Sequence, residues 1–297
     1  MVIHVVAPTF REPELVPQFV EAWADLGRTD VRIRIVNGNP GDETSDWIRD
    51  YSGEIEVEEI KGAPELYWSG LTRLGLRRTL EEASDADLFV LTNIDVRIIG
   101  DPISSILEQF PDLNERQVTI PVVTQEGAVT STGVEVVSWA LSRNHHLWDG
   151  WRGEDLPDSE TVSLTYLPTR FLCCSVEALG TAGFPNAESL PHYCADYEFT
   201  NRLRLAGYAP IAFSGARAEL VEENTGFDTY LLDTSLWSRL RRLNDIKCAY
   251  NLRYRYRFVR LTYPLAAQVP GMISHFAKIF LEVLLGGRAL QRWRSRS

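Results

Sequence analysis

GFPNAESLPHYCADYEFTNRLRLAGY, residues 183–208, contains a turn, acidic residues, an amphipathic segment and a glycine that can stop a helix within one short run. Its apolar positions recur about one helical turn apart, at Ala195, Phe199, Leu203 and Ala206. This spacing predicts a helix that presents an apolar stripe to the body of the protein and stops at Gly207.

Asp196 lies in the first turn of this predicted helix. The helix dipole and the backbone N–H groups at a helix start favour an ionised carboxylate there. The preceding loop, Pro191-His192-Tyr193, can leave that carboxylate open to a ligand. Glu198 and Arg202 stand four residues apart, which predicts an ion pair on one helix face. An ordinary first-turn acid is the alternative explanation of Asp196.

Length and composition predict a folded protein in a reducing compartment. A chain of 297 residues that is 44% hydrophobic can bury a full core, as one large α/β domain or as a domain with an appendage. The first residues lack a basic segment and a cleavage site, so we expect no secretory signal. No apolar run is long enough to span a bilayer. The four cysteines have neither zinc-ligand spacing nor an obvious disulfide framework, which favours the cytoplasm.

Charge is unevenly distributed along the chain. A net charge of −11 argues against general affinity for nucleic acid. After Trp237, thirteen Lys and Arg residues face only Asp245 and Glu282, so this segment carries +11 and the rest carries −22. We therefore predict an acidic catalytic domain at residues 1–228 and a helical basic C-terminal extension at residues 229–297, although solvated helix faces also explain a basic tail.

Strand-like and helix-like segments alternate in the first half of the chain. Apolar or β-rich runs predict strands at residues 2–7, 31–36, 55–60 and 86–92, and the runs between them predict helices at residues 14–26, 42–51 and 71–83. Ser69-Gly70 is predicted as a turn before the third helix. This order predicts an α/β fold with a mostly parallel, Rossmann-like central sheet flanked by helices, and with ligands at the carboxyl ends of the strands.

The second half of the chain is less regular. It predicts helices at residues 102–110 and 175–180 and strands at residues 118–123, 129–137, 171–176 and 209–213. Residues 138–168 show no clear period. We interpret them as a long functional loop or an acceptor-side insertion.

Polar and aromatic residues follow the predicted strands. Thr9, Phe10 and Arg11 offer a hydroxyl, an aromatic face and a charge, where a nucleotide base could stack. Asn37 follows the second strand and keeps hydrogen-bonding groups there. An ordinary strand-to-helix loop and an Asn-Gly turn are the respective alternatives.

Asn93-Ile94-Asp95 follows a very apolar strand. A hard cation such as Mg²⁺ or Mn²⁺ prefers oxygen ligands and shares its shell with substrate phosphates, so Asp95 with an amide or water is chemically sufficient. An Asx turn is the alternative. Trp68 and Gly70 precede a helical segment whose N-terminus could face phosphate oxygens, unless Trp68 only fills the core.

Together these motifs resemble those of family 2 glycosyltransferases, inverting enzymes of the GT-A fold. The run from Cys194 to Phe199 with Arg202 and Gly207-Tyr208 is similar to the acceptor-side motif, in which an acidic pair opens a helix and an aspartate is the general base. Ala195 replaces the first acid, so Asp196 alone inherits the catalytic role. The resemblance also places four residues on the acceptor side: His192, Tyr193, Glu198 and Arg202.

The same resemblance covers the donor side, over residues 2–212. Thr9, Phe10 and Arg11 are similar to the first nucleotide-binding motif, and Asn37 stands where the family often carries an aspartate that contacts the base. Asn93-Ile94-Asp95 is similar to the DXD-type motif, which implies Asp95 as the metal ligand. Trp68 and Gly70 are similar to the segment near the sugar-nucleotide. The family's downstream histidine is not evident, and Glu222, Glu223 and Asn224 occur there instead.

These motifs imply an inverting transfer of sugar from a nucleoside-diphosphate sugar to a hydroxyl of a growing polysaccharide or a lipid-linked glycan. A nucleotidyltransferase is one alternative, but Pro8-Thr9-Phe10-Arg11 is a poor phosphate loop. A non-catalytic module that binds a polyanion or carbohydrate through the Arg and aromatic run at residues 253–260 is another. The overall acidity counts against nucleic acid as its ligand.

One amphipathic segment near the C-terminus indicates a surface contact. Its apolar face is expected to comprise Met272, Ile273, Phe276, Ile279, Phe280, Val283 and Leu284, with Arg288, Arg292, Arg294 and Arg296 beyond. Such a helix could lie on anionic lipid, at the inner face of the plasma membrane. Core packing or a homodimer contact explains the same stripe.

Overall fold

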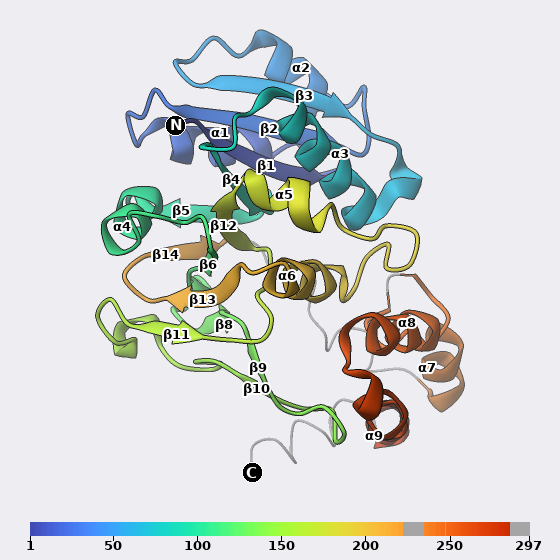
Figure 1. Ribbon diagram of the computed structural model, residues 1–297. Coiled ribbons are helices and arrows are strands. Elements are labelled where there is room, and N and C mark those ends of the chain that lie inside the picture. Colours follow the sequence, from blue (N-terminus) through green and yellow to red (C-terminus); the bar gives the residue numbers. More distant parts are fainter. Residues whose placement is uncertain (222–234, 247, 286–297) are drawn as a thin grey trace.

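The computed structural model describes residues 1–221, 235–246 and 248–285 (Figure 1). A mixed eight-stranded sheet lies at its centre, with helices on both faces. Its strands are, in spatial order, β11 (Thr161–Ser163), β13 (Ala209–Phe213), β6 (Arg116–Thr119), β12 (Phe171–Ser175), β4 (Leu88–Thr92), β1 (Ile3–Thr9), β2 (Val31–Asn37) and β3 (Glu56–Lys61).

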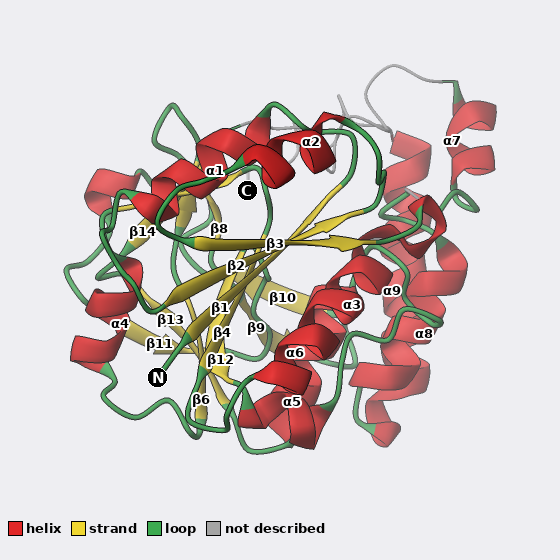
Figure 2. Cartoon of the chain, turned by 90° about the horizontal axis from the view of Figure 1, so that it is seen from above, coloured by secondary structure: helices red, strands yellow, loops and turns green. Residues whose placement is uncertain are grey.

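The half of the sheet from β4 to β3 is parallel, as the alternation of strands and helices predicts. Its crossovers contain α1 (Leu15–Ala24), α2 (Glu43–Asp50) and α3 (Tyr67–Glu82). Every residue of β1 is buried, because one core with α1 covers one face and another core with α3 covers the other (Figure 2). Thr9 pairs in register with Asn37, so β1 and β2 end side by side.

The other half of the sheet is mixed. β12 runs antiparallel to both β4 and β6, while β13 is parallel to β6 and β11 is antiparallel to β13. Consequently the amino end of β12 lies at the carboxyl edge of the parallel strands. Two shorter helices, α4 (Pro102–Gln109) and α5 (Glu177–Ala182), cover opposite faces of the sheet.

The single strand expected at residues 118–123 is wrong. Pro121 interrupts it, since proline has no N–H for a ladder hydrogen bond. The chain leaves the main sheet after Thr119 and enters a second, four-stranded sheet. That sheet comprises β5 (Val96–Ile99), β14 (Arg217–Leu220), β7 (Val122–Val123) and β8 (Val129–Ser131).

Residues 138–168 contain more regular structure than expected. β9 (Val134–Ser138) and β10 (Arg143–His146) form an antiparallel pair, a 3₁₀ turn occupies Gly153–Asp155, and β11 joins the main sheet. These strands are short and largely exposed, so they lack the apolar alternation by which a sequence reveals a strand.

The turn expected at Ser69-Gly70 is also wrong, because α3 already begins at Tyr67. A 3₁₀ turn at Pro64–Leu66 leads into it, and Leu66 packs so closely on Gly70 that an added Cβ would lie 2.8 Å from its Cβ. At Gly75 an added Cβ would lie 2.4 Å from Val6 Cγ1. α3 therefore crosses β1 at short range, which only glycine permits.

Three helices end the described chain: α7 (Leu236–Arg242), α8 (Leu252–Thr262) and α9 (Leu265–Leu285). α8 lies beside α6 (Ala195–Leu205) and buries Tyr254, Phe258 and Val259 in a core that includes Cys194 (Figure 1). These helices thus pack on the body of the protein. The domain boundary expected at residue 228 lies outside the described residues.

Candidate active site

The start of α3 connects the end of β4 with the loop that enters α6. The Trp68 indole Nε1 donates to Asn93 Oδ1 at 3.1 Å. The Ser69 backbone N–H donates to the Pro191 carbonyl at 3.0 Å. Three segments that are far apart in the sequence, each holding predicted site residues, therefore meet at the carboxyl edge of the parallel strands.

Asp196 is half-buried in the first turn of α6. Cys194, the residue at the helix N-cap, has a left-handed backbone (φ 66°) and makes no side-chain cap. Burial raises the pKa of Asp196 to about 6, although the Tyr197 backbone N–H and the positive charge of Arg255 act to lower it. A carboxylate with this pKa is ionised at neutral pH and still accepts a proton readily.

Arg170 interacts with both the end of β4 and Asp196. The Thr92 hydroxyl Oγ1 donates to the Arg170 carbonyl at 2.7 Å, and the positive charge of Arg170 also lowers the pKa of Asp196. Asn93 and Asp95 come within three residues after Thr92, so Arg170 links the base candidate to the segment that carries the metal-ligand candidate.

Sequence analysis missed Arg170 and the role of Arg255. Arg170 precedes a buried strand, and the amino end of a strand in a parallel sheet would lie away from the ligand edge. Since β12 is antiparallel, its amino end lies at that edge instead. Arg255 belongs to the basic run that suggested a polyanion surface; its guanidinium Nε donates to the Ala249 carbonyl at 2.6 Å. Arg257, in the same run, donates to the Glu188 and Ser189 carbonyls. This run is therefore partly structural.

The loop after β1 carries the first group of donor-side candidates. Thr9 is buried, and its hydroxyl makes no hydrogen bond within the described part of the chain. Arg11 has a left-handed backbone (φ 62°), and its guanidinium lies 5.0 Å from the centre of the Phe10 ring. The Gly38 N–H donates to the Thr9 carbonyl at 2.9 Å, which joins this loop to the end of β2. Backbone strain of this kind is common at ligand-binding loops.

Asn37 does not face a ligand. It is fully buried, and its amide nitrogen donates to Asp42 at 3.0 Å and to Glu59 at 2.9 Å. Its amide oxygen accepts from the Asn39 N–H at 2.8 Å. These bonds use the amide to hold the Asn-Gly turn, so the expected contact between Asn37 and a base is not retained.

Gly70 likewise has no place at a ligand, because it is buried within α3 instead of preceding it. Trp68 remains at the site through its bond to Asn93. We expected the N-terminus of this helix to face phosphate oxygens. In the structure the helix begins at Tyr67, which has a left-handed backbone (φ 49°).

Glu198 and Arg202 form the ion pair that their spacing predicts. Arg202 Nε lies 2.6 Å from Glu198 Oε1, and Glu198 is only 2% exposed. Arg202 also donates to the carbonyls of Ala182 and Phe184. The pair therefore ties α6 to the segment that precedes it. Their expected role on the acceptor side is not retained.

His192 and Tyr193 stay candidates for the acceptor side. Both are half-buried in the loop before α6, and their rings lie edge to face with centres 4.7 Å apart. They come immediately before Cys194 and Asp196, so they are within reach of a molecule that approaches the carboxylate.

The residues near Asp95 fit a metal that shares its shell with a ligand. Asp95 is half-buried after β4, and its carbonyl accepts from the Val221 N–H at 2.8 Å. The neighbouring amide oxygen of Asn93 already accepts from Trp68. Within residues 1–221, 235–246 and 248–285, no group of three His, Cys, Asp or Glu side chains could hold a metal by itself. Glu222, Glu223 and Asn224 lie outside the described residues. One carboxylate thus suits a cation that is also bound by phosphate oxygens and water.

No protein-family model and no curated protein sequence matches this chain. Solved structures match its fold. GalNAc-T7 with UDP, GalNAc and Mn²⁺ has a TM-score of 0.57 at 11% identity, over 95% of this chain and 54% of that one. S. aureus TarS has a TM-score of 0.56 at 11% identity, over 89% of this chain and 44% of that one. The mannosyltransferase PcManGT from Pyrobaculum calidifontis, in complex with GDP-Man and Mn²⁺, has a TM-score of 0.54 at 13% identity, over 94% and 69% of the two chains.

These similarities define the class of fold: an α/β protein with a mixed central sheet flanked by helices. More particularly, the chain has the GT-A fold of glycosyltransferases, which confirms the expected fold. It spans about half the length of the first two of these structures.

Proposed function

We propose that this protein is an inverting glycosyltransferase that uses a nucleoside-diphosphate sugar. The observation that carries this proposal is Asp196, a carboxylate with a pKa of about 6 at the start of α6, which is influenced by the charge of Arg170, a residue bonded to the end of the strand that leads to Asp95. The similar folds include proteins in complex with UDP, UDP-GlcNAc and GDP-Man, two of them with Mn²⁺.

In the proposed reaction Asp196 accepts the proton of an acceptor hydroxyl. The oxygen then attacks the anomeric carbon from the face opposite the departing nucleoside diphosphate, and a single displacement inverts the configuration. Thr9, Phe10, Arg11 and Trp68 bind the donor. Arg170 and Arg255 place positive charge near the base and keep it ionised at neutral pH. A divalent cation, Mg²⁺ or Mn²⁺, held by Asp95 would neutralise the charge of the leaving diphosphate.

We also propose that the acceptor is a polysaccharide or lipid-linked glycan reached at a membrane surface. The apolar stripe expected on α9 divides in the structure: Ile279 and Val283 are buried, and Met272 and Phe276 pack on the core. Its other members, Ile273, Phe280 and Leu284, are exposed and continue a stripe with Leu265 and Val269 on the same helix.

Exposed basic residues on the preceding helix α8, Arg253 and Arg260, support anionic lipid as the partner of this stripe. A homodimer contact is the other use of the stripe. None of the helices in the described residues is both long and apolar enough to cross a bilayer.

Replacing Val269 and Ile273 by Ser should abolish binding to anionic vesicles. Retained binding would contradict the membrane contact, and a concentration-dependent dimer would favour the homodimer alternative.

A panel of nucleotide sugars tests the central proposal. At 100 times its dissociation constant the correct donor should stabilise the protein by about 2.7 kcal/mol in thermal unfolding. The pure protein with Mn²⁺ should also hydrolyse that donor slowly, and Asp95→Ala should not. If no nucleotide sugar stabilises the protein or is hydrolysed, the proposed function is wrong.

A further inference from the structure

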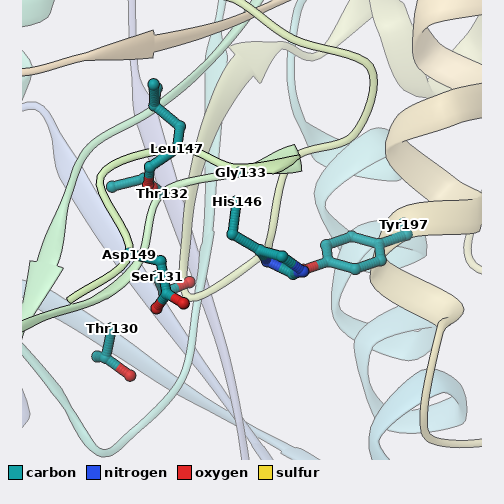
Figure 3. A pocket seen from close by; sticks show the side chains of 8 residues that line it. All are labelled: Thr130, Ser131, Thr132, Gly133, His146, Leu147, Asp149 and Tyr197. Carbon is teal, nitrogen blue, oxygen red and sulfur yellow. The ribbon is translucent and has the colours of Figure 1, made fainter. Parts of the chain in front are cut away.

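A polar pocket lies beside the N-terminal part of α6, apart from the donor-side residues (Figure 3). It encloses about 270 Å³, including its open mouth. Its walls come from β8 and the turn after it, the end of β10 and the residues that follow it, and Tyr197 of α6. The lining residues are Thr130, Ser131, Thr132, Gly133, His146, Leu147, Asp149 and Tyr197.

The two main walls are held together by backbone hydrogen bonds. The Leu147 N–H donates to the Gly133 carbonyl at 3.0 Å, and the Val129 N–H donates to the Trp151 carbonyl at 2.8 Å. Gly133 has φ +138°, and an added Cβ would lie 2.5 Å from Leu164 Cδ1. The pocket is therefore formed before any ligand arrives, which reduces the entropy lost on binding.

The third wall is a positioned aromatic ring. Tyr197 stacks on the buried Tyr166, with ring centres 5.5 Å apart and planes inclined by 14°. Figure 3 shows the Tyr197 side chain reaching from α6 toward His146 across the pocket. Tyr197 follows Asp196 in α6, so the pocket and the proposed base share the first turn of one helix.

The lining has the chemistry of a site for neutral hydroxyl-rich molecules. Thr130 and Ser131 can donate and accept hydrogen bonds, and the carboxylate of Asp149 accepts from hydroxyl groups. Leu147 and the Tyr197 ring offer apolar surface. None of the described residues that line it is Lys or Arg; the carboxylate of Asp149 repels an anion, and only a protonated His146 would offset that repulsion.

The volume of the pocket limits the size of the ligand. The space of about 270 Å³ includes open solvent, so the enclosed part is smaller and suits a single small ring better than an extended chain.

We propose that this pocket binds one neutral sugar ring or polyol of the acceptor, and that it selects against phosphorylated or otherwise anionic units at that position. This inference rests on the proposed glycosyltransferase function and adds the chemical class of the acceptor unit. In this proposal Asp149 and Ser131 determine which acceptor unit binds, and Asp196 alone accepts the proton.

Ligand-observed NMR tests the pocket with defined probes: methyl α-glucopyranoside, methyl N-acetyl-β-glucosaminide and myo-inositol as neutral ligands, and glycerol 3-phosphate and inorganic phosphate as anionic ones. At least one neutral probe should bind more tightly than both anions. Asp149→Asn should weaken that binding about tenfold, as expected for a lost charged hydrogen bond. Asp158→Asn, an exposed aspartate outside the pocket, is the matched control and should bind as the parent protein does.

The outcomes separate this inference from the proposed function. Tighter binding of the anions, unchanged binding in Asp149→Asn, or no binding of any neutral probe would overturn the pocket assignment. Thermal stabilisation by nucleotide sugars, measured on the same samples, reports separately on the donor side. Its absence together with intact, Asp149-dependent binding of a neutral probe would remove the glycosyltransferase proposal and leave a carbohydrate-binding pocket.

Discussion

Asp87 and Asp196 are aspartates near opposite edges of the parallel strands, and their environments act in opposite directions. Burial would raise the pKa of Asp87, but hydrogen bonds from the Val2 and Ser84 backbone N–H groups outweigh it and lower that pKa. At Asp196 burial dominates and raises the pKa to about 6. Hydrogen bonds therefore stabilise Asp87 as an anion, whereas the raised pKa of Asp196 lets it accept a proton more easily.

The surroundings of the two aspartates differ as well: paired charges surround Asp87, and left-handed backbone lies near Asp196. On the Asp87 side, Arg34 is buried and pairs with Glu58 and Glu82, and its guanidinium lies 2.7 Å from His4 Nδ1. On the Asp196 side, the loops contain left-handed backbone at Arg11, Tyr67 and Cys194. Paired charges stabilise a fold, while strained backbone and a raised carboxylate pKa typify functional sites.

The largest expected effect tests the catalytic side of this comparison. Asp196→Asn keeps the shape of the side chain but removes its basicity, so transfer should fall by roughly 10²- to 10⁴-fold while donor binding persists. Steady-state transfer and nucleotide-sugar titration measure the two quantities. Asp46→Asn, an exposed change on α2, is the control. Near-normal turnover of Asp196→Asn would remove this residue from its proposed role.

Substitutions on the Asp87 side should lower the stability of the protein without lowering its activity. Arg34→Met leaves Glu58 and Glu82 without their buried partner, and such changes cost about 3 kcal/mol of unfolding free energy when the carboxylates are partly exposed. Denaturant unfolding measures it. Arg32→Met breaks the more exposed pair with Glu56 and should cost about 1 kcal/mol or less. Equal losses in the two variants would contradict a special role for the Arg34 network.

Asp95→Asn tests the donor end of the active-site edge. Removal of the carboxylate should lower metal-dependent donor hydrolysis on the order of a hundredfold, because stabilisation of a leaving phosphate by a cation is worth several kcal/mol. Titration with Mn²⁺ and Mg²⁺ measures the rate and the metal affinity together. An unchanged metal dependence would exclude Asp95 as the ligand.

The pH dependence follows from the raised pKa of Asp196. Transfer should fall about tenfold per pH unit below about pH 6, as the base becomes protonated. The folded protein binds this proton more tightly than the unfolded chain, so the contribution of Asp196 to stability decreases as pH rises from about 4 to 6. Asp196→Asn should lack both trends. A flat rate profile from pH 5 to 8 would contradict the assignment.

The smallest effect concerns the Asn37 turn. Asp42 accepts from the Thr44 N–H at 3.1 Å as the cap of α2 and from the Asn37 amide at 3.0 Å. Asp42→Ala should cost about 1 kcal/mol of stability, as typical for a lost N-cap. Donor affinity should change less than twofold. A large loss of donor affinity would return the Asn37 turn to the binding site.

The parts of the site that sequence predicted well are those set by neighbours in the chain. The α6 helix, its Glu198–Arg202 pair and its stop follow from positions within four residues of one another. Gly207 has a left-handed backbone (φ 107°), and the Tyr208 N–H donates to the Leu203 carbonyl at 3.0 Å. Local spacing and one glycine suffice for this helix because the backbone hydrogen bonds that define a helix join residues four apart.

The predictions that failed depend on partners far away in the chain. Ser69-Gly70 has the composition of a turn, but the Ser69 N–H bonds to the distant Pro191 carbonyl, and both residues lie within α3. Asn37 has the chemistry of a base contact, but Glu59, from the next strand, uses its amide nitrogen. No local pattern records which distant group a polar side chain meets.

By itself the sequence determined the alternation of strands and helices, the parallel half of the sheet and Asp196 at a helix start. Only the tertiary structure decided that β12 runs antiparallel, which brings Arg170 to the edge where Asp196 lies. It also decided that residues 130–133 and 146–149 enclose a pocket against Tyr197. Strand direction and pocket walls arise from pairing between segments whose separation in sequence carries no signal, whereas a helix is defined within a few residues of itself.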